Sequence, residues 1–181
     1  MSVVVRSFTT LEMGPDEAAA MRALLDAAFG TGEDAFGDLD WEHVLGGLHV
    51  VAAVRGEIVA CAAVVRRVLE VDGRPLRTGY VEAVATRPDV QGTGLGTAVM
   101  EVAGEHIRST YELGALATGA FHFYERLGWE RWRGPTAVRT PTGLQRTPDE
   151  DGYMMILRTR WTPPLDPAGT LSCEWRPGDV W

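Results

Sequence analysis

The stretch Tyr80–Gly96 has residue types and spacing suited to holding a phosphate. It reads as a strand, a short turn and a loop with glycines at alternate positions (Gly92, Gly94 and Gly96), and an amphipathic helix follows. Such a loop presents unpaired backbone N–H groups at a helix start, where the helix dipole also favours negative charge. The third glycine of G-x-G-x-x-G is replaced by Thr97, and no Gly-Lys-Ser/Thr of a Walker loop follows. A glycine-rich turn without a ligand fits the same residues, so both interpretations stay open.

Hydrophobic periodicity and turn residues predict the elements that must position this loop. Strands are expected at Val3–Phe8, His49–Arg55, Glu57–Glu70, Pro75–Thr86, Leu113–Thr118, from Trp129 towards Arg133, and at Tyr153–Trp161; helices at Asp16–Phe29, from a cap at Asp38 or Asp40 through Leu45, at Gly94–Ser109 and at Gly119–Leu127; a loop at Gly134–Pro148; and a tail at Thr162–Trp181. The first strands form an antiparallel meander, and the helix between Val84 and Leu113 is a crossover that makes its flanking strands parallel. We therefore expect an α/β (α+β) mixed sheet in a single domain, 1–181.

Composition restricts the partners. The chain has 181 residues and a net charge of −8, so nucleic acid and anionic membrane are poor partners and a small polycation is a better one. The two cysteines and four histidines share no metal-ligand spacing, so we expect no metal. No signal peptide and no apolar run of ~18 residues is seen, which favours a cytoplasmic protein.

Two motifs carry a resemblance to a known family. Gln91-x-x-Gly94-x-Gly96 resembles the acetyl-CoA pyrophosphate loop of the GNAT acetyltransferase superfamily, and Phe123-Tyr124-x-x-x-Gly128-Trp129 resembles its C-terminal motif. The resemblance implies the GNAT acyl-CoA N-acyltransferase fold, with a splayed central mixed β-sheet, and acetyl-CoA as the donor. It also implies a pantetheine arm beside Val84, Ala85 and Thr86. The implied pyrophosphate site consists of Thr86, Arg87, Gln91, Gly92, Thr93, Gly94, Leu95 and Gly96.

A narrower resemblance spans residues 6–181. Asp40-Trp41-Glu42-His43-x-Leu45-Gly46-Gly47-x-His49, Gly79-Tyr80-Val81-Glu82-x-Val84, Tyr111-x-Leu113-Gly114-x-Leu116 and Gly178-Asp179-Val180-Trp181 are similar to aminoglycoside 2′-N-acetyltransferases. This implies acetyl transfer to the 2′-amine of an aminoglycoside by direct attack in a ternary complex, antibiotic resistance, and a homodimer. A kasugamycin-type amino sugar, a polyamine, or a non-catalytic CoA- or cation-binding protein are the alternatives.

The resemblance also assigns catalytic roles. Glu82, on the strand before the loop, would accept the amine proton through a water, and Tyr124 would protonate the leaving sulfur as general acid. An exposed strand glutamate in an ion pair is the other interpretation of Glu82, and a core tyrosine is that of Tyr124.

A cationic acceptor needs carboxylates, and acidic residues recur at places that the family uses. The predicted acceptor-binding residues are Asp34, Asp38, Asp40, Glu82, Ala117, Thr118, Asp151, Asp179 and Trp181. Trp181 would offer an aromatic wall and a terminal carboxylate, with the tail 162–181 closing the acceptor site. Ala117-Thr118-Gly119 stands where the family tends to have serines. A solvated loop with a helix cap explains Asp34–Asp40 equally, and a frayed terminus explains the tail.

Overall fold

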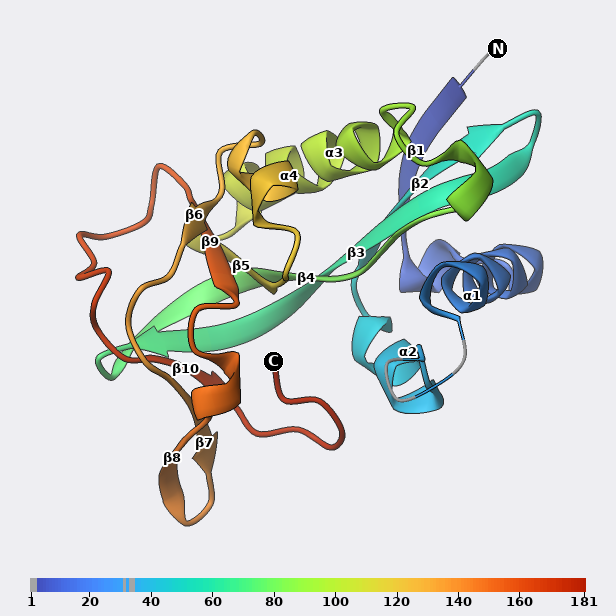
Figure 1. Cartoon of the computed structure of the whole chain (residues 1–181). Helices are drawn as coiled ribbons and strands as arrows, with labels where there is room; N and C mark the ends of the chain where they lie inside the picture. Colours follow the sequence, from blue (N-terminus) through green and yellow to red (C-terminus); the bar gives the residue numbers. More distant parts are fainter. Residues whose placement is uncertain (1–2, 31, 33–34) are drawn as a thin grey trace. The chain divides into compact units, whose positions relative to one another are not determined.

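A computed structural model describes residues 3–30, 32 and 35–181. The chain forms two compact units, Met1–Val65 with Val81–Ala103 and Arg66–Tyr80 with Gly104–Trp181, and each is described by itself. The elements (Figure 1) are β1 Val3–Thr9, η1 Thr10–Glu12, α1 Pro15–Phe29, α2 Asp38–Val44, β2 Leu48–Val54, β3 Glu57–Val71, β4 Arg74–Thr86, η2 Pro88–Val90, α3 Leu95–Thr110, β5 Leu113–Ala117, α4 Phe121–Glu125, β6 Glu130–Arg131, β7 Thr136–Thr140, β8 Gly143–Arg146, η3 Pro148–Glu150, β9 Met154–Arg158 and β10 Leu171–Glu174.

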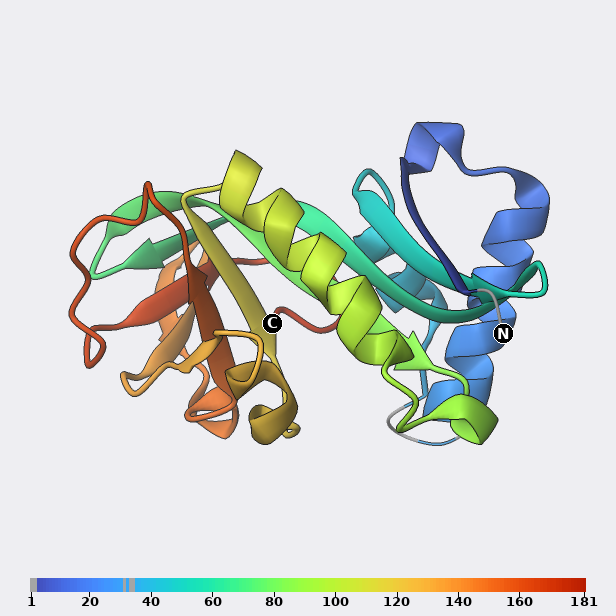
Figure 2. The same ribbon diagram turned by 90° about the horizontal axis from the view of Figure 1, so that it is seen from above.

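The first unit is built on an antiparallel meander of β1, β2 and the first half of β3. Val5 pairs with Ala52, and Val51 pairs with Cys61. Helix α1 lies along this meander in both views (Figures 1 and 2). The residues that α1 and its neighbours bury together are Phe8, Met21, Leu24, Leu25, Val51, Cys61 and Ala85. Burial of one large apolar side chain stabilises a fold by roughly 1.5–3 kcal/mol, so this core holds α1 against the strands.

The second unit contains a mixed sheet. Its strands follow the order β6-β9-β5-β4-β3-β10-β7-β8. The pair β4/β5 is parallel, through Thr78–Tyr80 and Leu113–Ala115, and so is β10/β7, whereas β5/β9, β6/β9, β10/β3 and β7/β8 are antiparallel. The predicted mixed sheet is confirmed, as is the parallel pairing that the crossover helix α3 imposes on its flanking strands.

The segment Gly134–Pro148 is not the loop that the sequence predicts. It contains the hairpin β7–β8, in which Ala137 pairs with Arg146 and Thr140 with Gly143. Its prolines lie outside the two strands, at residues 135, 141 and 148. Proline is tolerated at such strand ends because no ladder N–H is needed there, so the prolines concealed the hairpin instead of preventing it.

The tail also differs from the expectation. It contributes strand β10, in which Leu171 pairs with Thr136 of β7 and with Val71 of β3. Its last residue, Trp181, is only 4% exposed. The tail is therefore part of the second unit, and a frayed terminus is ruled out for it.

Helix α4 is shorter than its periodicity predicts. It ends at Glu125, and the following turns are closed by Leu127 N–H donating to the Tyr124 carbonyl and Gly128 N–H donating to the Glu125 carbonyl. Gly128, with a positive φ of 87°, lies at the end of these turns, so the predicted helix stop at Gly128 is wrong: the helix ends at Glu125 with Arg126 as its C-cap. Among the described residues, no helix is long and apolar enough to span a membrane.

Candidate functional site

Strand β4 contains a backbone kink at Ala83, directly after Glu82. Ala83 has a φ of +53°, in the left-handed region, whereas the other non-glycine residues with positive φ, Arg55 and Asp72, lie in hairpin turns. This conformation costs an L-residue about 1–2 kcal/mol. The Cys61 thiol donates a hydrogen bond of 3.3 Å to the Ala83 carbonyl and helps to hold the kink. No sequence signal indicated this feature, because alanine is an ordinary strand residue.

The predicted phosphate loop has the geometry of a turn that feeds a helix. Gly92 and Gly94 have φ values of 75° and 89°, and no described atom lies within 4 Å of a Cβ built on either. The Gln91 side chain donates to the Thr86 carbonyl at 3.1 Å, and the Thr93 hydroxyl donates to the Val90 carbonyl at 2.6 Å. Gln91 and Thr93 therefore fix the loop from within, while the glycines leave its outer side open.

The first turn of α3, which begins at Leu95 and includes Gly96, differs from those of α1 and α2. Helix α1 carries Asp16 and Glu17 in its first turn, and α2 carries Asp38 and Asp40, whereas the first turn of α3 has no acidic residue. Acidic side chains normally occupy this position because they complement the helix dipole. The exposed glycines 92 and 94 and the uncompensated start of a 16-residue helix together form a place for an external anion.

The Arg87 side chain makes ion pairs within the protein. Its guanidinium pairs with Asp89 at 2.6 Å and with Glu57 at 3.1 Å, and these two carboxylates raise its pKa. Its backbone N–H donates to the Val59 carbonyl at 2.8 Å. A bound anion would therefore compete with two carboxylates for the Arg87 guanidinium.

The candidate site residues of β4 differ in how deeply they are buried. Glu82, Val84 and Thr86 are half-buried, and Ala85 is buried in the core of the first unit. The Oε2 atom of Glu82 is itself fully buried. Ala85 can approach a ligand only through its backbone.

Tyr124 lies in the second unit, in α4. It is 7% exposed and makes edge-on ring contacts with Phe123, at 4.9 Å between centroids, and with Trp129, at 6.1 Å. Burial raises the pKa of Tyr124 to about 12. The phenol therefore stays protonated at neutral pH, as both a general acid and a core tyrosine require.

The predicted acceptor residues of the first unit are partly engaged. Asp34 lies outside the described residues. Asp38 is exposed and pairs with Arg22 at 2.7 Å, and Asp40 accepts the Gly37 N–H at 2.7 Å. The prediction that Asp38 or Asp40 caps this helix is wrong, because Gly37 is the N-cap and α2 begins at Asp38; Asp40, the third helical residue, accepts the N–H of that cap.

Ala117 and Thr118 end strand β5 in the second unit. Ala117 is exposed. The Thr118 hydroxyl accepts the Ala120 N–H at 2.9 Å, and the Thr118 N–H donates to the Tyr153 carbonyl. The hydroxyl supports the turn into α4.

Asp151, directly after η3, and Asp179, near the end of the tail, both make internal hydrogen bonds. Asp151 accepts both the backbone N–H and the hydroxyl of Thr136, and pairs with Arg146 at 2.6 Å. Asp179 accepts the Trp181 N–H at 3.1 Å, and the Trp181 indole donates to the Thr147 hydroxyl at 2.9 Å. These contacts bring the end of the chain onto the turn that follows β8.

Glu150 is the residue of this region that the predicted site omitted. Burial raises its pKa, and the negative charges of Asp179 and Asp149 raise it further. A carboxylate destabilised by neighbouring carboxylates marks a region of negative potential that favours a cation. The acidic run Asp149-Glu150-Asp151 was the available sequence signal, but burial selects Glu150 within it.

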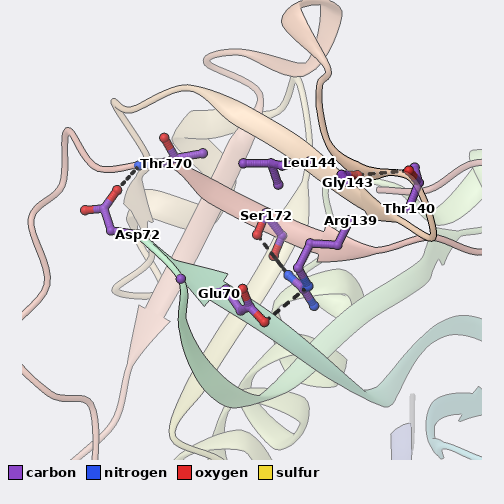
Figure 3. A pocket seen from close by; sticks show the side chains of 9 residues that line it. Glu70, Asp72, Arg139, Thr140, Gly143, Leu144, Thr170 and Ser172 are labelled. Atoms are coloured by element: carbon purple, nitrogen blue, oxygen red, sulfur yellow. Dashed lines mark hydrogen bonds and ion pairs between the residues drawn. The ribbon is translucent and has the colours of Figure 1, made fainter.

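A separate pocket of about 400 Å³ lies where β3, β7 and β10 meet. Figure 3 shows Arg139 beside Glu70 and Ser172, and Thr170 beside Asp72. The Arg139 guanidinium pairs with Glu70 at 3.3 Å and donates to the Ser172 carbonyl at 2.7 Å. Its donors are thus satisfied internally, and none of the predicted site residues lines this pocket. In the described part of the chain, no group of three or more His, Cys, Asp or Glu residues could hold a metal ion.

Comparison with known proteins identifies the family. The family model of the acetyltransferase (GNAT) domain matches residues 11–132. The chain belongs to the GNAT family. A protein of Mycolicibacterium fortuitum named aminoglycoside 2′-N-acetyltransferase is 41% identical to this GNAT protein over 176 residues, which cover 95% of this chain and 89% of that protein.

Solved structures share the GNAT fold. The GNAT family N-acetyltransferase YhbS of Escherichia coli, in complex with CoA, matches with a TM-score of 0.65 and 18% identity over 94% of this chain and 89% of that chain. A GNAT family acetyltransferase of Brucella melitensis, in complex with acetyl-CoA, matches with a TM-score of 0.63 and 17% identity over 94% of both chains. A probable N-acyltransferase of Enterococcus faecalis is longer: the match covers 75% of this chain and about a third of that one, at 19% identity and a TM-score of 0.61.

Proposed function

We propose that this protein transfers an acetyl group from acetyl-CoA to the 2′-amine of an aminoglycoside. The observation that carries the proposal is the 41% identity to an aminoglycoside 2′-N-acetyltransferase over almost the whole chain. Fold similarity alone would support acetyl transfer without an acceptor, because GNAT folds can serve many amines. Identity along both compact units extends the similarity beyond the matched GNAT region.

The residues of the first unit fit the donor. The open outer side of Gly92 and Gly94 and the acid-free first turn of α3 suit a pyrophosphate. The β4 backbone at Val84 and Thr86, beyond the kink at Ala83, hydrogen-bonds the amides of the pantetheine arm as an added strand would. Acetyl-CoA supplies an acetyl group activated as a thioester.

Glu82 and Tyr124 divide the proton transfers between them. Glu82 accepts a proton from the acceptor ammonium through a water, which leaves a neutral amine able to attack the carbonyl carbon. As the C–N bond forms and the C–S bond breaks, Tyr124 gives its proton to the sulfur, and the second proton that the nitrogen loses on becoming an amide restores the phenol through solvent. Its pKa of about 12 keeps the phenol protonated until that step.

The acceptor is recognised as a polycation. Glu150 and Asp179 supply negative potential, and the raised pKa of Glu150 expresses the unfavourable charge that a bound ammonium relieves. Asp34, Asp38, Asp40, Ala117, Thr118 and Trp181 complete the proposed acceptor-binding set. We further propose that the protein is a cytoplasmic homodimer and that its activity confers antibiotic resistance.

Kanamycin A and kanamycin B provide a matched test, because they differ only in a hydroxyl or an amine at the 2′ position. We expect CoA release, followed with a chromogenic thiol reagent, with kanamycin B and at most a trace with kanamycin A. NMR of the product should show the acetyl group on the 2′-nitrogen. Equal turnover of both compounds, or acetylation at another nitrogen, would contradict the proposed regiochemistry. Turnover of spermidine alone would move the acceptor to the polyamines.

A further inference from the structure

Three side chains and a carboxylate form one hydrogen-bonded chain in the second unit. The Trp181 indole N–H donates to the Thr147 hydroxyl at 2.9 Å, the Thr147 hydroxyl donates to the Thr136 hydroxyl at 2.9 Å, and the Thr136 hydroxyl lies 2.9 Å from Oδ1 of Asp151. This hydrogen-bonded series joins the end of the tail to the residue after β8, to β7 and to the residue after η3.

The donor directions in this chain are fixed by its ends. An indole N–H can only donate and an ionised carboxylate can only accept. Thr147 accepts from Trp181, so its own proton is available for Thr136, and the proton of Thr136 is available for Asp151. The Thr136 hydroxyl can also donate to the Thr147 carbonyl at 2.7 Å, because that carbonyl uses only one of its two lone pairs for the Glu150 N–H at 3.0 Å. The carboxylate is the stronger acceptor because it is charged.

Burial makes the chain stiff. Thr136 is fully buried and Trp181 is 4% exposed, so water cannot easily replace a broken link at either residue, whereas the Asp151 side chain at the acceptor end is 38% exposed. Asp151 itself is fixed by the Thr136 N–H at 2.7 Å and by the Arg146 guanidinium at 2.6 Å. Although burial raises the pKa of Asp151, the hydrogen bonds from Thr136 and the Arg146 charge lower it more, so the acceptor end stays ionised.

A second set of contacts fixes the backbone of the same segment. The Arg176 guanidinium donates to the Asp179 carbonyl at 2.7 Å and to the Trp181 carbonyl at 3.3 Å. These contacts hold the backbone of the turn 176–181, whereas the indole ring is held by its burial, at 4% exposed, and by its N–H. The chain that ends at Asp151 is the one that fixes the ring through its N–H.

We propose that Asp151 is a positioning residue that orients the Trp181 ring for acceptor recognition through Thr136 and Thr147, and does not itself contact the acceptor. This rests on the proposed function, in which Trp181 belongs to the acceptor site. It assigns Asp151 a role different from that of Asp179 and Glu150, whose charges act on the acceptor directly. Thr136 and Thr147 become specificity-determining residues that no sequence motif indicates.

The indole N–H of Trp181 reports on the chain without any activity measurement. The protein has six tryptophans, and Trp181→Phe identifies the Trp181 signal in a ¹H–¹⁵N spectrum. We expect Asp151→Asn and Thr147→Val to accelerate hydrogen exchange of this N–H about tenfold, the equivalent of about 1.4 kcal/mol. Thr147→Ser keeps the hydroxyl and should exchange as the parent does. If the Trp181 N–H exchanged at the parent rate in both Asp151→Asn and Thr147→Val, the proposed series of hydrogen bonds would be wrong.

Kinetics with kanamycin B then test the consequence for recognition. Asp151→Asn and Thr147→Val should raise the KM for kanamycin B about tenfold and leave the KM for acetyl-CoA within twofold, and Thr147→Ser should restore the parent value. Asp166→Asn is the matched control, because it removes one exposed carboxylate of the same unit, one that only closes a local turn with the Ala168 N–H. It should change neither KM.

The outcomes separate the two roles of Asp151. A raised KM in Asp151→Asn with a normal KM in Thr147→Val would mean that the carboxylate binds the acceptor directly, and would overturn the proposal. Faster exchange without any change in KM would also overturn it, because the ring orientation would then not matter for recognition. If the parent acetylates no aminoglycoside, the proposed function is wrong, and so is the role of Asp151 in acceptor recognition. Hydrogen exchange of the Trp181 N–H would still show whether the series of hydrogen bonds forms. Thermal unfolding confirms that each variant is folded.

Discussion

Gly79 of β4 and Gly114 of β5 are direct partners in the parallel register of these strands. A Cβ built on Gly79 would lie 2.7 Å from the Tyr111 ring and 2.9 Å from the Ile107 side chain, and one built on Gly114 would lie 2.9 Å from Leu157 and 3.0 Å from Ile107. The two glycines therefore let the last turns of α3 pack closely on the pair of strands.

We expect Gly79→Ala to destabilise the protein by about 1–3 kcal/mol, because the added methyl group overpacks this interface. Urea unfolding measures the change. Gly104→Ala is the matched control in the same unit: the nearest atom to its built Cβ is the mobile end of Arg108, at 3.2 Å, and alanine favours the helix. Equal destabilisation by both variants would contradict the packing argument.

Gly94→Ala should weaken donor binding. Its φ of 89° is unfavourable for alanine by about 1–2 kcal/mol, although the space beside it is open. The strain would be relieved by moving the loop, so we expect the KM for acetyl-CoA to rise about tenfold. Gly56→Ala introduces comparable strain, at φ 86°, in the β2–β3 turn, and should lower stability without changing that KM.

Glu82→Gln keeps the shape of the side chain and removes its basicity. We expect kcat to fall about 10²–10⁴-fold, the usual contribution of a general base, with the KM for acetyl-CoA unchanged within twofold. Glu101→Gln, on the exposed side of α3, is the control and should retain parent kcat. A normal kcat in Glu82→Gln would remove Glu82 from the mechanism.

We expect protonation of Glu150 to cause the rise of the acceptor KM at low pH, the acid limb of its pH profile. Burial and the charges of Asp179 and Asp149 raise its pKa, so protonation begins at a higher pH than for an ordinary glutamate. Because only the ionised form attracts a cation, the KM for kanamycin B should rise as the pH falls through that pKa. Glu150→Gln should have a raised KM at every pH and lose this limb of the profile; persistence of the limb would assign it to another group.

The free energy of unfolding should fall as the pH rises above 9. Burial raises the pKa of Cys61 from 9.0 to about 12 and that of Cys173 to about 11, so both thiols stay protonated when the unfolded chain ionises. Their contribution is present below pH 9 and is lost as the pH rises towards 11–12, at about 1.4 kcal/mol per pH unit for each thiol. Urea unfolding between pH 7 and 11 measures the slope, and Cys173→Ala should reduce it. A slope unchanged in Cys173→Ala would assign the loss to other groups, such as Tyr124.

The backbone around the candidate site was predictable where it depends on local spacing. The alternate glycines at 92 and 94, the helix α3 that follows them and the parallel strands on either side of that helix could be read from residue order, because loop conformation and crossover topology are set by neighbours in the chain. The hairpin β7–β8 was missed because its prolines fall just outside the paired residues.

The sequence by itself determined the family and the acidic character of the chain, and it predicted the donor loop, since these follow from motifs and composition. Only the tertiary structure decided that Glu150 is the half-buried residue of its acidic run, that Ala83 is kinked, and that Trp181 is joined to Asp151 through two threonines. The physical reason is that hydrogen bonds and desolvation depend on residues distant in the chain. Nothing in the sequence indicates that Thr136, on β7, will link Thr147 to Asp151 by hydrogen bonds.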